Sequence, residues 1–397
     1  MSKQKRKPDK EMRRFNRSLI NMELYIHLPF CKSKCQYCDF NSRANQDEGT
    51  IFSYLTALNR EIRYAAKAYE KAKIDTVYIG GGTPSLLDAG KIKSICNVLG
   101  ESFDLSGVKE FSIECNPESI TEEKLAAYRE CGINRISIGV QSLNDFNLRT
   151  IGRLHDAYTA VEKIKLTARY FDNVSCDVIV GLPYDTNEVV EEELKTLAPL
   201  VQHMSVYALT LEEGTPLAKR VNDGKLLLPT EDEVADMLDI TATTLERLGL
   251  QKYEISNFAR EGRESRHNYG YWTDEEYIGL GAGAHSYIKT VDGEKPLANP
   301  IRFASPSDIH AYIAGINCVD SYASVPRVEM RVLSDKDVWN ERIMLGLRTV
   351  RGVESDLLDG KIPAELSGFF KNRDGYTALT KAGMSVMNGI LVRIMQL

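Results

Sequence analysis

Short runs of β-branched and aromatic residues alternate with amphipathic stretches along the first half of the chain. The runs have the length and composition of buried strands, which we expect at residues 23–27, 76–79, 110–114, 135–140, 175–180 and 204–209. Between them, apolar residues recur at helical spacing, which predicts helices within residues 52–72, 87–99, 121–130 and 188–197. Six alternating units of this kind predict an α/β fold, a partial (β/α)6 barrel with parallel strands.

The pattern changes in the last part of the chain. Beyond about residue 325 it becomes one amphipathic helix at residues 338–347 and then shorter elements, which predicts a second, small helical unit. We therefore expect a basic N-terminal tail (1–22), a partial barrel (23–230), an extension of the barrel (231–325) and a C-terminal helical domain (326–397).

Composition narrows the classes of protein that fit. A chain of 397 residues can bury a large core, and it contains no apolar run long enough to cross a membrane. A net charge of -6 argues against a nucleic-acid partner, although the first twenty residues are basic. That tail lacks the apolar core of a secretory signal, so we expect a cytoplasmic protein. The tail is either a solvated end or a weak attachment to anionic lipid.

Candidate functional residues follow the carboxyl ends of the expected strands, one strand after another. Three cysteines follow the first strand, a glycine-rich turn follows the second, and polar residues lie at or near the ends of the next three. Because the carboxyl ends of parallel strands meet at one edge of a barrel, we expect a single site there. In chain order its residues are Cys31, Cys35, Cys38, Gly81, Gly82, Thr83, Glu114, Gln141 and Asp177.

Each of these polar features also has an ordinary structural interpretation. The glycines at residues 80–82 form a tight turn, or they let backbone groups approach a ligand. Glu114 is a solvated carboxylate or the hydrogen-bond acceptor of a ribose diol, and Arg153 is a surface cation or the partner of a cofactor carboxylate. Their shared position at the strand ends favours the ligand interpretation.

The three clustered cysteines have the spacing C-x-x-x-C-x-x-C. A structural zinc takes four ligands, and a 4Fe-4S cluster that only transfers electrons is usually held by four cysteines. Three thiolates on a four-iron cluster leave one iron open to a small molecule. A zinc site with a distant fourth ligand is the alternative, whereas an odd number of cysteines argues against a disulfide framework. The other five cysteines are scattered singly and are expected to be small buried hydrophobic residues.

The cysteine spacing resembles that of the radical S-adenosylmethionine (SAM) superfamily. Together with the segments Gly80-Gly-Gly-Thr-Pro84, Ile113-Glu-Cys-Asn-Pro117, Gly139-Val-Gln-Ser142 and Asp177-Val-Ile-Val-Gly-Leu-Pro183, it resembles the oxygen-independent coproporphyrinogen III oxidase-like family over roughly residues 23–390. The resemblance implies a 4Fe-4S cluster on the three cysteines and a winged-helix-like C-terminal domain over the barrel mouth. It also implies that SAM is bound by Tyr25, Gly81, Gly82, Thr83, Glu114, Gln141, Arg153 and Asp177.

That family contains true oxidases and haem chaperones. The oxidases have a further cysteine two residues after the third, where this chain has Phe40. Residues 267–272 match the H-N-x-x-Y-W motif of the chaperone branch, which implies His267 as a haem ligand. Imidazole is a common axial ligand of haem, and Tyr271 and Trp272 offer flat faces for a macrocycle. The residues by themselves favour a packed aromatic cluster around a buried histidine, and the match to the whole motif turns the preference to haem.

We therefore expect a haem chaperone that binds haem, SAM and a 4Fe-4S cluster and delivers haem to an acceptor protein. As finer expectations, the acceptor is membrane-associated, and the chaperone lies at the inner face of the membrane. The alternatives are coproporphyrinogen III oxidation, another radical SAM reaction, and a barrel with a zinc staple. The sequence leaves open whether SAM is cleaved, and so whether the protein is an enzyme. It also leaves open the acceptor, the second haem ligand and the oligomeric state.

Two further features have second rank. The glycine-rich segment 279–283 does not lie in a β-α-β unit, so we reject a nucleotide-binding loop; in the family a similar segment helps to close the SAM site. His27 and His285 are secondary candidates for haem binding or for the polarity of the site, and a structural role is favoured for both.

Overall fold

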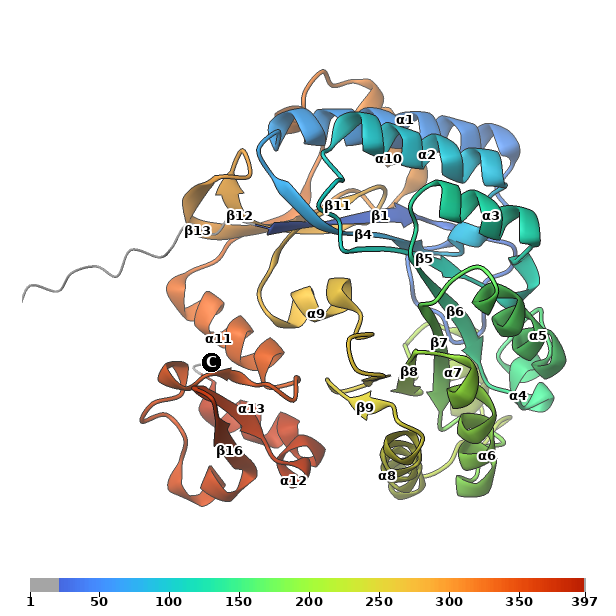
Figure 1. The fold of residues 1–397 in the computed structure, drawn as a ribbon, viewed down its shortest axis with the longest axis vertical. Coiled ribbons are helices and arrows are strands. Elements are labelled where there is room, and N and C mark those ends of the chain that lie inside the picture. Colours follow the sequence, from blue (N-terminus) through green and yellow to red (C-terminus); the bar gives the residue numbers. More distant parts are fainter. Residues whose placement is uncertain (1–20, 396–397) are drawn as a thin grey trace, which may run out of the picture.

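A curved sheet with six neighbouring parallel strands forms the centre of the computed structural model, which describes residues 21–395 (Figure 1). Each parallel strand pairs with the next one along the chain. The expected strands and their order are confirmed, and the tail expected at residues 1–22 lies almost entirely outside the described residues. The strands are β1 (Asn21–Leu28), β4 (Lys73–Gly81), β5 (Glu110–Cys115), β6 (Arg135–Gln141), β7 (Val174–Val180) and β8 (His203–Ala208).

Helices cover the outer, convex face of this sheet (Figure 1). Their starts follow from local capping: Asp47 accepts a hydrogen bond from the backbone of Thr50, so the first helix begins four residues earlier than its apolar pattern suggests. Buried aliphatic side chains from these helices and from the sheet form one continuous core. The helices are α1 (Glu48–Ala68), α2 (Ala89–Ser102), α3 (Glu122–Glu130), α4 (Asp145–Thr150), α5 (Ala157–Ala168), α6 (Asn187–Leu197), α7 (Pro216–Asn222), α8 (Glu231–Arg247) and α10 (Ile309–Asn317).

The segment expected to extend the barrel, together with residues 328–332 from the expected C-terminal domain, adds strands at both edges of the sheet. β11 (Glu276–Leu280) runs parallel to β1, and β12 (His285–Val291), β13 (Lys295–Ala304) and β14 (Val328–Val332) follow it as antiparallel neighbours. At the opposite edge, β10 (Asn257–Ala259) and β9 (Gln251–Lys252) follow β8.

Helix α9 (Arg266–Trp272) lies inside the curve of the sheet, and it carries the H-N-x-x-Y-W motif (Figure 1). The Glu110 carboxylate on β5 accepts hydrogen bonds from the backbone N–H groups of Arg266 and His267, at 2.9 and 3.3 Å. A negative charge at a helix N-terminus is favourable, so this contact fixes the helix inside the barrel.

The C-terminal unit has its own hydrophobic core and contains more than helices. Its helices α11 (Asp335–Gly346), α12 (Lys381–Ser385) and α13 (Met387–Ile394) accompany a three-stranded antiparallel sheet of β15 (Val353–Glu354), β17 (Tyr376–Leu379) and β16 (Phe370–Arg373). The purely helical expectation was therefore incomplete. Asp374 and Gly375, both with positive φ, form the hairpin turn between β16 and β17, and this Asp-Gly pair was the sequence signal for it. The winged-helix assignment stays a prediction.

Among the described helices, none is both long enough and apolar enough to cross a bilayer.

Candidate functional site

The three clustered cysteines lie on a loop that leaves the carboxyl end of β1. β2 (Phe30–Cys31) pairs with β3 (Arg43–Ala44), which closes the loop at its base. The thiols of Cys31, Cys35 and Cys38 are free and partly exposed, and all three residues line one cavity of about 120 Å³. Thr83 donates a hydrogen bond to the sulfur of Cys31, and Arg153 donates one to the sulfur of Cys35, each at 3.5 Å.

The donor set fits a cluster better than a single metal ion. Within residues 21–395, no group of three or more His, Cys, Asp and Glu side chains is placed so that it could hold a single metal ion. A four-iron cluster takes each thiolate on a different iron, so three thiols arranged around a shared cavity suit it. Burial raises the pKa of Cys31 and Cys38, so the positive charge of iron would be what holds them as thiolates.

The glycine turn after β4 is both a tight turn and a place of close approach. Gly81 has a φ of 115°, and a Cβ on it would lie 2.7 Å from the ring of His27. A Cβ on Gly82 would lie 2.7 Å from the carbonyl oxygen of Phe30, beside the first cysteine. Glycine is therefore required at both positions, because the cysteine loop packs directly against the backbone of the turn.

Two carboxylates stand at the strand ends beside this turn. Glu114 accepts hydrogen bonds from the Tyr78 hydroxyl at 2.8 Å and from the backbone N–H of Gly81 at 3.0 Å. Burial raises the pKa of Glu114 to about 7, and burial also raises the pKa of Asp177, which Ser137 contacts at 3.4 Å. Desolvated carboxylates of this kind gain stability from hydroxyl donors, as a ribose diol would supply.

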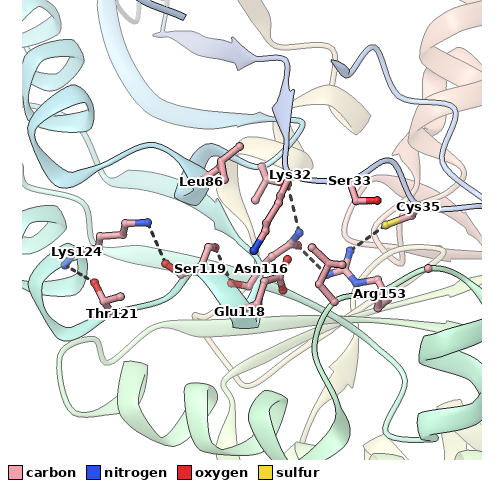
Figure 2. A pocket seen from close by; sticks show the side chains of 13 residues that line it. Lys32, Ser33, Cys35, Leu86, Asn116, Glu118, Ser119, Thr121, Lys124 and Arg153 are labelled. Atoms are coloured by element: carbon pink, nitrogen blue, oxygen red, sulfur yellow. Dashed lines mark hydrogen bonds between the residues drawn. The ribbon is translucent and has the colours of Figure 1, made fainter. Parts of the chain in front are cut away.

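Arg153 connects the cysteine loop to the strand ends. Its guanidinium donates to the Asn116 side chain at 2.8 Å and to the sulfur of Cys35, both drawn in Figure 2. It also donates to the Gly139 carbonyl at 2.6 Å. The Nε atom of Arg153 is buried and has no partner among the described residues. An unpaired guanidinium donor beside the cysteines suits the carboxylate of a ligand. Sequence reasoning did not single out Asn116, although it stands two residues after Glu114 in the same motif.

Gln141 has a positive φ of 71°, which is uncommon for a residue with a side chain. The pairing of β6 with β7 shifts register between Gly139 and Gln141, so a bulge at the strand end re-aims this side chain. The structure brings the expected SAM residues together: the same cavity of about 120 Å³ is lined by Gly81, Gly82, Thr83, Glu114, Gln141, Arg153 and Asp177. Tyr25 is the exception.

Tyr25 lines a second, larger cavity of about 710 Å³ that shares Cys38, Glu114, Gln141 and Asp177 with the first one. Its volume lies within the range of small-molecule and cofactor sites. The described residues that line it include four carboxylates and no lysine or arginine. Aromatic and aliphatic members complete the wall: Tyr37, Phe40, Tyr78, Ile179, Tyr207, Leu209 and Tyr271.

His267 lies on the wall of this larger cavity, almost fully buried. Its ring stacks on Tyr78 with centroids 5.0 Å apart, and burial lowers its pKa to about 3, so the imidazole is neutral at pH 7. The histidine therefore belongs to an aromatic cluster and also faces a cavity. Trp272 is not among the residues that line this cavity, and the guanidinium of Arg348 lies 6.0 Å from its ring; its expected contact with a macrocycle stays a prediction.

The second-rank features have structural roles. The Tyr54 hydroxyl and the carbonyl of His27 would each lie 2.6 Å from a Cβ on Gly281, so the glycine-rich segment packs against the base of the cysteine loop. His27 bonds Tyr25 through Nδ1 at 3.0 Å and the Asn41 carbonyl through Nε2 at 2.8 Å, which occupies both ring nitrogens. His285 is exposed and lines neither cavity.

The partial barrel, the three-cysteine loop and the polar strand ends together define a radical SAM protein. A family comparison agrees, since the profile of the Radical SAM superfamily matches residues 25–197. The chain is 35% identical to the protein named "Heme chaperone HemW" of Bacillus subtilis, over 87% of this chain and 88% of the relative. It is also 35% identical to the HemW of Lactococcus lactis, over 85% and 84% of the two chains. The chain therefore belongs to the HemW family of radical SAM proteins.

Among solved structures, coproporphyrinogen III oxidase (HemN) from Escherichia coli matches with a TM-score of 0.78, at 22% identity, over 95% of this chain and 90% of the other. At that identity the likeness concerns the fold. The family expected from the sequence motifs is thus confirmed, and so is the fold class.

Proposed function

We propose that this protein is a haem chaperone that binds haem in the larger cavity, holds a 4Fe-4S cluster in the adjoining smaller one with SAM reaching from the cluster to the wall that the two cavities share, and passes haem to an acceptor protein. The observation that carries the proposal is a neutral, buried imidazole, that of His267, on the wall of a cavity of about 710 Å³ whose exposed lining is mostly apolar. Relatives also support the proposal, because several members of the family are named "Heme chaperone HemW".

The chain's own residues divide into three roles in this proposal. Cys31, Cys35 and Cys38 hold the cluster, which supplies an iron with an open coordination position and an electron. Arg153, whose Nε is an unpaired donor, and the backbone at residues 81–83, which lines the smaller cavity, face the amino and carboxylate end of SAM. Tyr25 and the side chains at the ends of β5, β6 and β7 hold the remainder, with carboxylates as acceptors for ribose hydroxyls and Gln141 beside them.

The charge of the larger cavity separates the chaperone from the oxidase. Coproporphyrinogen III carries twice as many propionates as haem. The described lining holds Asp39 and Glu212, besides the desolvated carboxyls of Glu114 and Asp177, and no lysine or arginine, so it offers the extra propionates of a more anionic tetrapyrrole no cationic partner. Haem can keep its two propionates at the solvent side of the cavity. Phe40, which stands where the oxidases have a further cysteine, also lines this wall and is 68% exposed.

An anaerobic haem titration of cluster-reconstituted protein, followed by Soret absorbance, tests the proposal. Wild type, His267→Ala and His285→Ala are compared, because His285 is an exposed histidine of the same chain that lines neither cavity. Saturable binding that only His267→Ala abolishes supports the chaperone and its ligand together. Binding that survives in His267→Ala moves the ligand elsewhere. If wild type binds no haem, the proposal fails and conversion of coproporphyrinogen III becomes the next assay.

The finer parts of the proposal concern place and partner. We place the protein in the cytoplasm, with a haem-requiring acceptor at the inner membrane face and the basic residues of the N-terminal tail as the contact with anionic lipid. That tail lies outside the described residues. Cosedimentation with anionic vesicles, compared with neutral vesicles of the same size, tests the contact. Equal binding to both kinds would contradict it.

A further inference from the structure

Thr76, His267 and Tyr271 form a chain of hydrogen bonds that ends at the wall of the larger cavity. The Nδ1 atom of His267 lies 2.7 Å from the Thr76 hydroxyl and 3.9 Å from the Glu23 carboxyl. The Nε2 atom of His267 lies 2.8 Å from the Tyr271 hydroxyl. Both ring nitrogens are therefore in use.

The proton positions in this chain follow from acidity. A phenol O–H is a far stronger acid than the N–H of a neutral imidazole, so the Tyr271 hydroxyl donates and Nε2 accepts. Because a neutral imidazole carries one proton, that proton lies on Nδ1 and is donated to Thr76. This is the tautomer that a metal-binding histidine needs: one nitrogen donates to an orienting partner, and the lone pair of the other is directed outward.

Tyr271 occupies that lone pair. An iron on Nε2 and the hydroxyl proton of Tyr271 would use the same electron pair, so they exclude each other. The bond to His267 is the one hydrogen bond that the Tyr271 hydroxyl makes with the described residues. Both side chains line the cavity, and Tyr271 is only half-buried, so its phenol can turn without opening the core.

The ring of Tyr271 has contacts besides the one its hydroxyl makes. The edge of its ring meets Tyr277 with centroids 4.7 Å apart, and the neighbouring Trp272 is covered by Arg348. The hydroxyl of Tyr277 accepts a hydrogen bond from Arg302 at 2.9 Å and makes no contact with His267. The Tyr271 hydroxyl makes one hydrogen bond to the imidazole, and the Tyr271 ring also meets the His267 ring edge-on, with centroids 5.0 Å apart.

We propose that Tyr271 is a displaceable cap on His267, whose hydroxyl leaves Nε2 when haem iron binds and retakes it when haem is passed on. The inference rests on the proposed function, since it takes His267 as the haem ligand. Iron must replace an existing hydrogen bond, so the cap weakens haem binding and offers the imidazole a partner at the moment of release. A chaperone needs both, because it has to give up its cargo.

Removal of the hydroxyl should tighten binding. A buried hydrogen bond of this kind has a net worth that corresponds to roughly a fivefold to tenfold change in an equilibrium constant. We expect Tyr271→Phe to lower the Kd for haem by that factor and to slow transfer to apomyoglobin, used as a haem sink, to a similar extent. The gain should vanish in Tyr271→Phe/His267→Ala.

Tyr277→Phe is the matched control, because it removes a phenol hydroxyl from the same aromatic cluster without touching His267; its Kd should equal that of wild type. A damaged fold weakens binding, so a tighter Kd cannot come from damage. An unchanged or weaker Kd in Tyr271→Phe overturns the cap and leaves the chaperone proposal standing. Normal binding by His267→Ala overturns both the ligand and its cap, and the absence of binding by wild type overturns the proposed function itself.

Discussion

The backbone N–H of Gly81 donates a hydrogen bond of 3.0 Å to the carboxylate of Glu114, which joins the carboxyl ends of β4 and β5. The same carboxylate takes the Tyr78 hydroxyl on its other oxygen. One side chain thus sets the distance between the glycine turn under the cysteine loop and the wall of the larger cavity.

Glu114→Gln should weaken SAM binding. The carboxylate already accepts two hydrogen bonds, and an amide in its place offers one acceptor oxygen and adds a donor that faces the Gly81 N–H or the Tyr78 hydroxyl. We expect a Kd for SAM that is higher by roughly tenfold to a hundredfold, measured by equilibrium dialysis of the reconstituted protein. Glu123→Gln, an exposed change on α3, should bind like wild type. Equal affinities of Glu114→Gln and wild type would remove Glu114 from the SAM site.

Gly81→Ala should destabilise the fold. A residue with a side chain pays the strain of a φ of 115°, and the new Cβ would lie 2.7 Å from the His27 ring. We expect a loss of about 2 kcal/mol or more in the free energy of unfolding, measured with urea. Gly100→Ala on α2 is the comparison, since nothing lies within 4 Å of its added Cβ, and helix propensity should make it neutral or slightly stabilising. If both variants have the same free energy of unfolding, the close approach at Gly81 does not contribute to stability.

Serine at each clustered cysteine should abolish the cluster. Cys31→Ser, Cys35→Ser and Cys38→Ser each remove one thiol from the shared cavity, so iron and sulfide content should fall from about four per chain to near zero. The wild-type cluster absorbance should bleach in air, because its thiolates are accessible. Cys96→Ser, a buried thiol of α2 away from the cavity, should keep full iron content. A serine variant that retained four irons would show that its cysteine is not a ligand.

Glu61→Gln should remove a pH dependence of stability. Glu61 on α1 accepts hydrogen bonds from the Gly281 N–H and the Tyr312 hydroxyl, and burial raises its pKa to about 7 from an ordinary value of 4.5. A carboxyl with a raised pKa binds its proton more tightly in the folded state, so its contribution is fully present below pH 4.5 and is lost as pH rises through 7.

Glutamine does not titrate, so the stability of Glu61→Gln relative to wild type should rise by up to about 3 kcal/mol between pH 4.5 and pH 8. Urea unfolding of both proteins across that range measures the difference, and the other titrating groups cancel because both proteins carry them. A constant difference would contradict the raised pKa.

Local sequence patterns were enough to predict the barrel strands and most of the helices. The six parallel strands are short buried runs, and their identity depends on side chains within each run. The three-stranded sheet of the C-terminal unit was missed because β16 is exposed along most of its length and has no apolar alternation to read. Its one local signal, the turn pair Asp374-Gly375, predicts a hairpin only if the segments on either side are recognised as strands, and the third strand, β15, lies elsewhere in the sequence.

The chemistry of the site divides in the same way. The sequence by itself determined the donor types: three cysteines in one loop, a glycine turn, and carboxylates at strand ends, because each occupies a fixed place in its own β/α unit. Only the tertiary structure decided which of them meet. Arg153 reaches Cys35 across 118 positions of the chain, and Thr76 reaches His267 across 191. Such contacts depend on how strands curve and where α9 docks, and no local pattern records those relations.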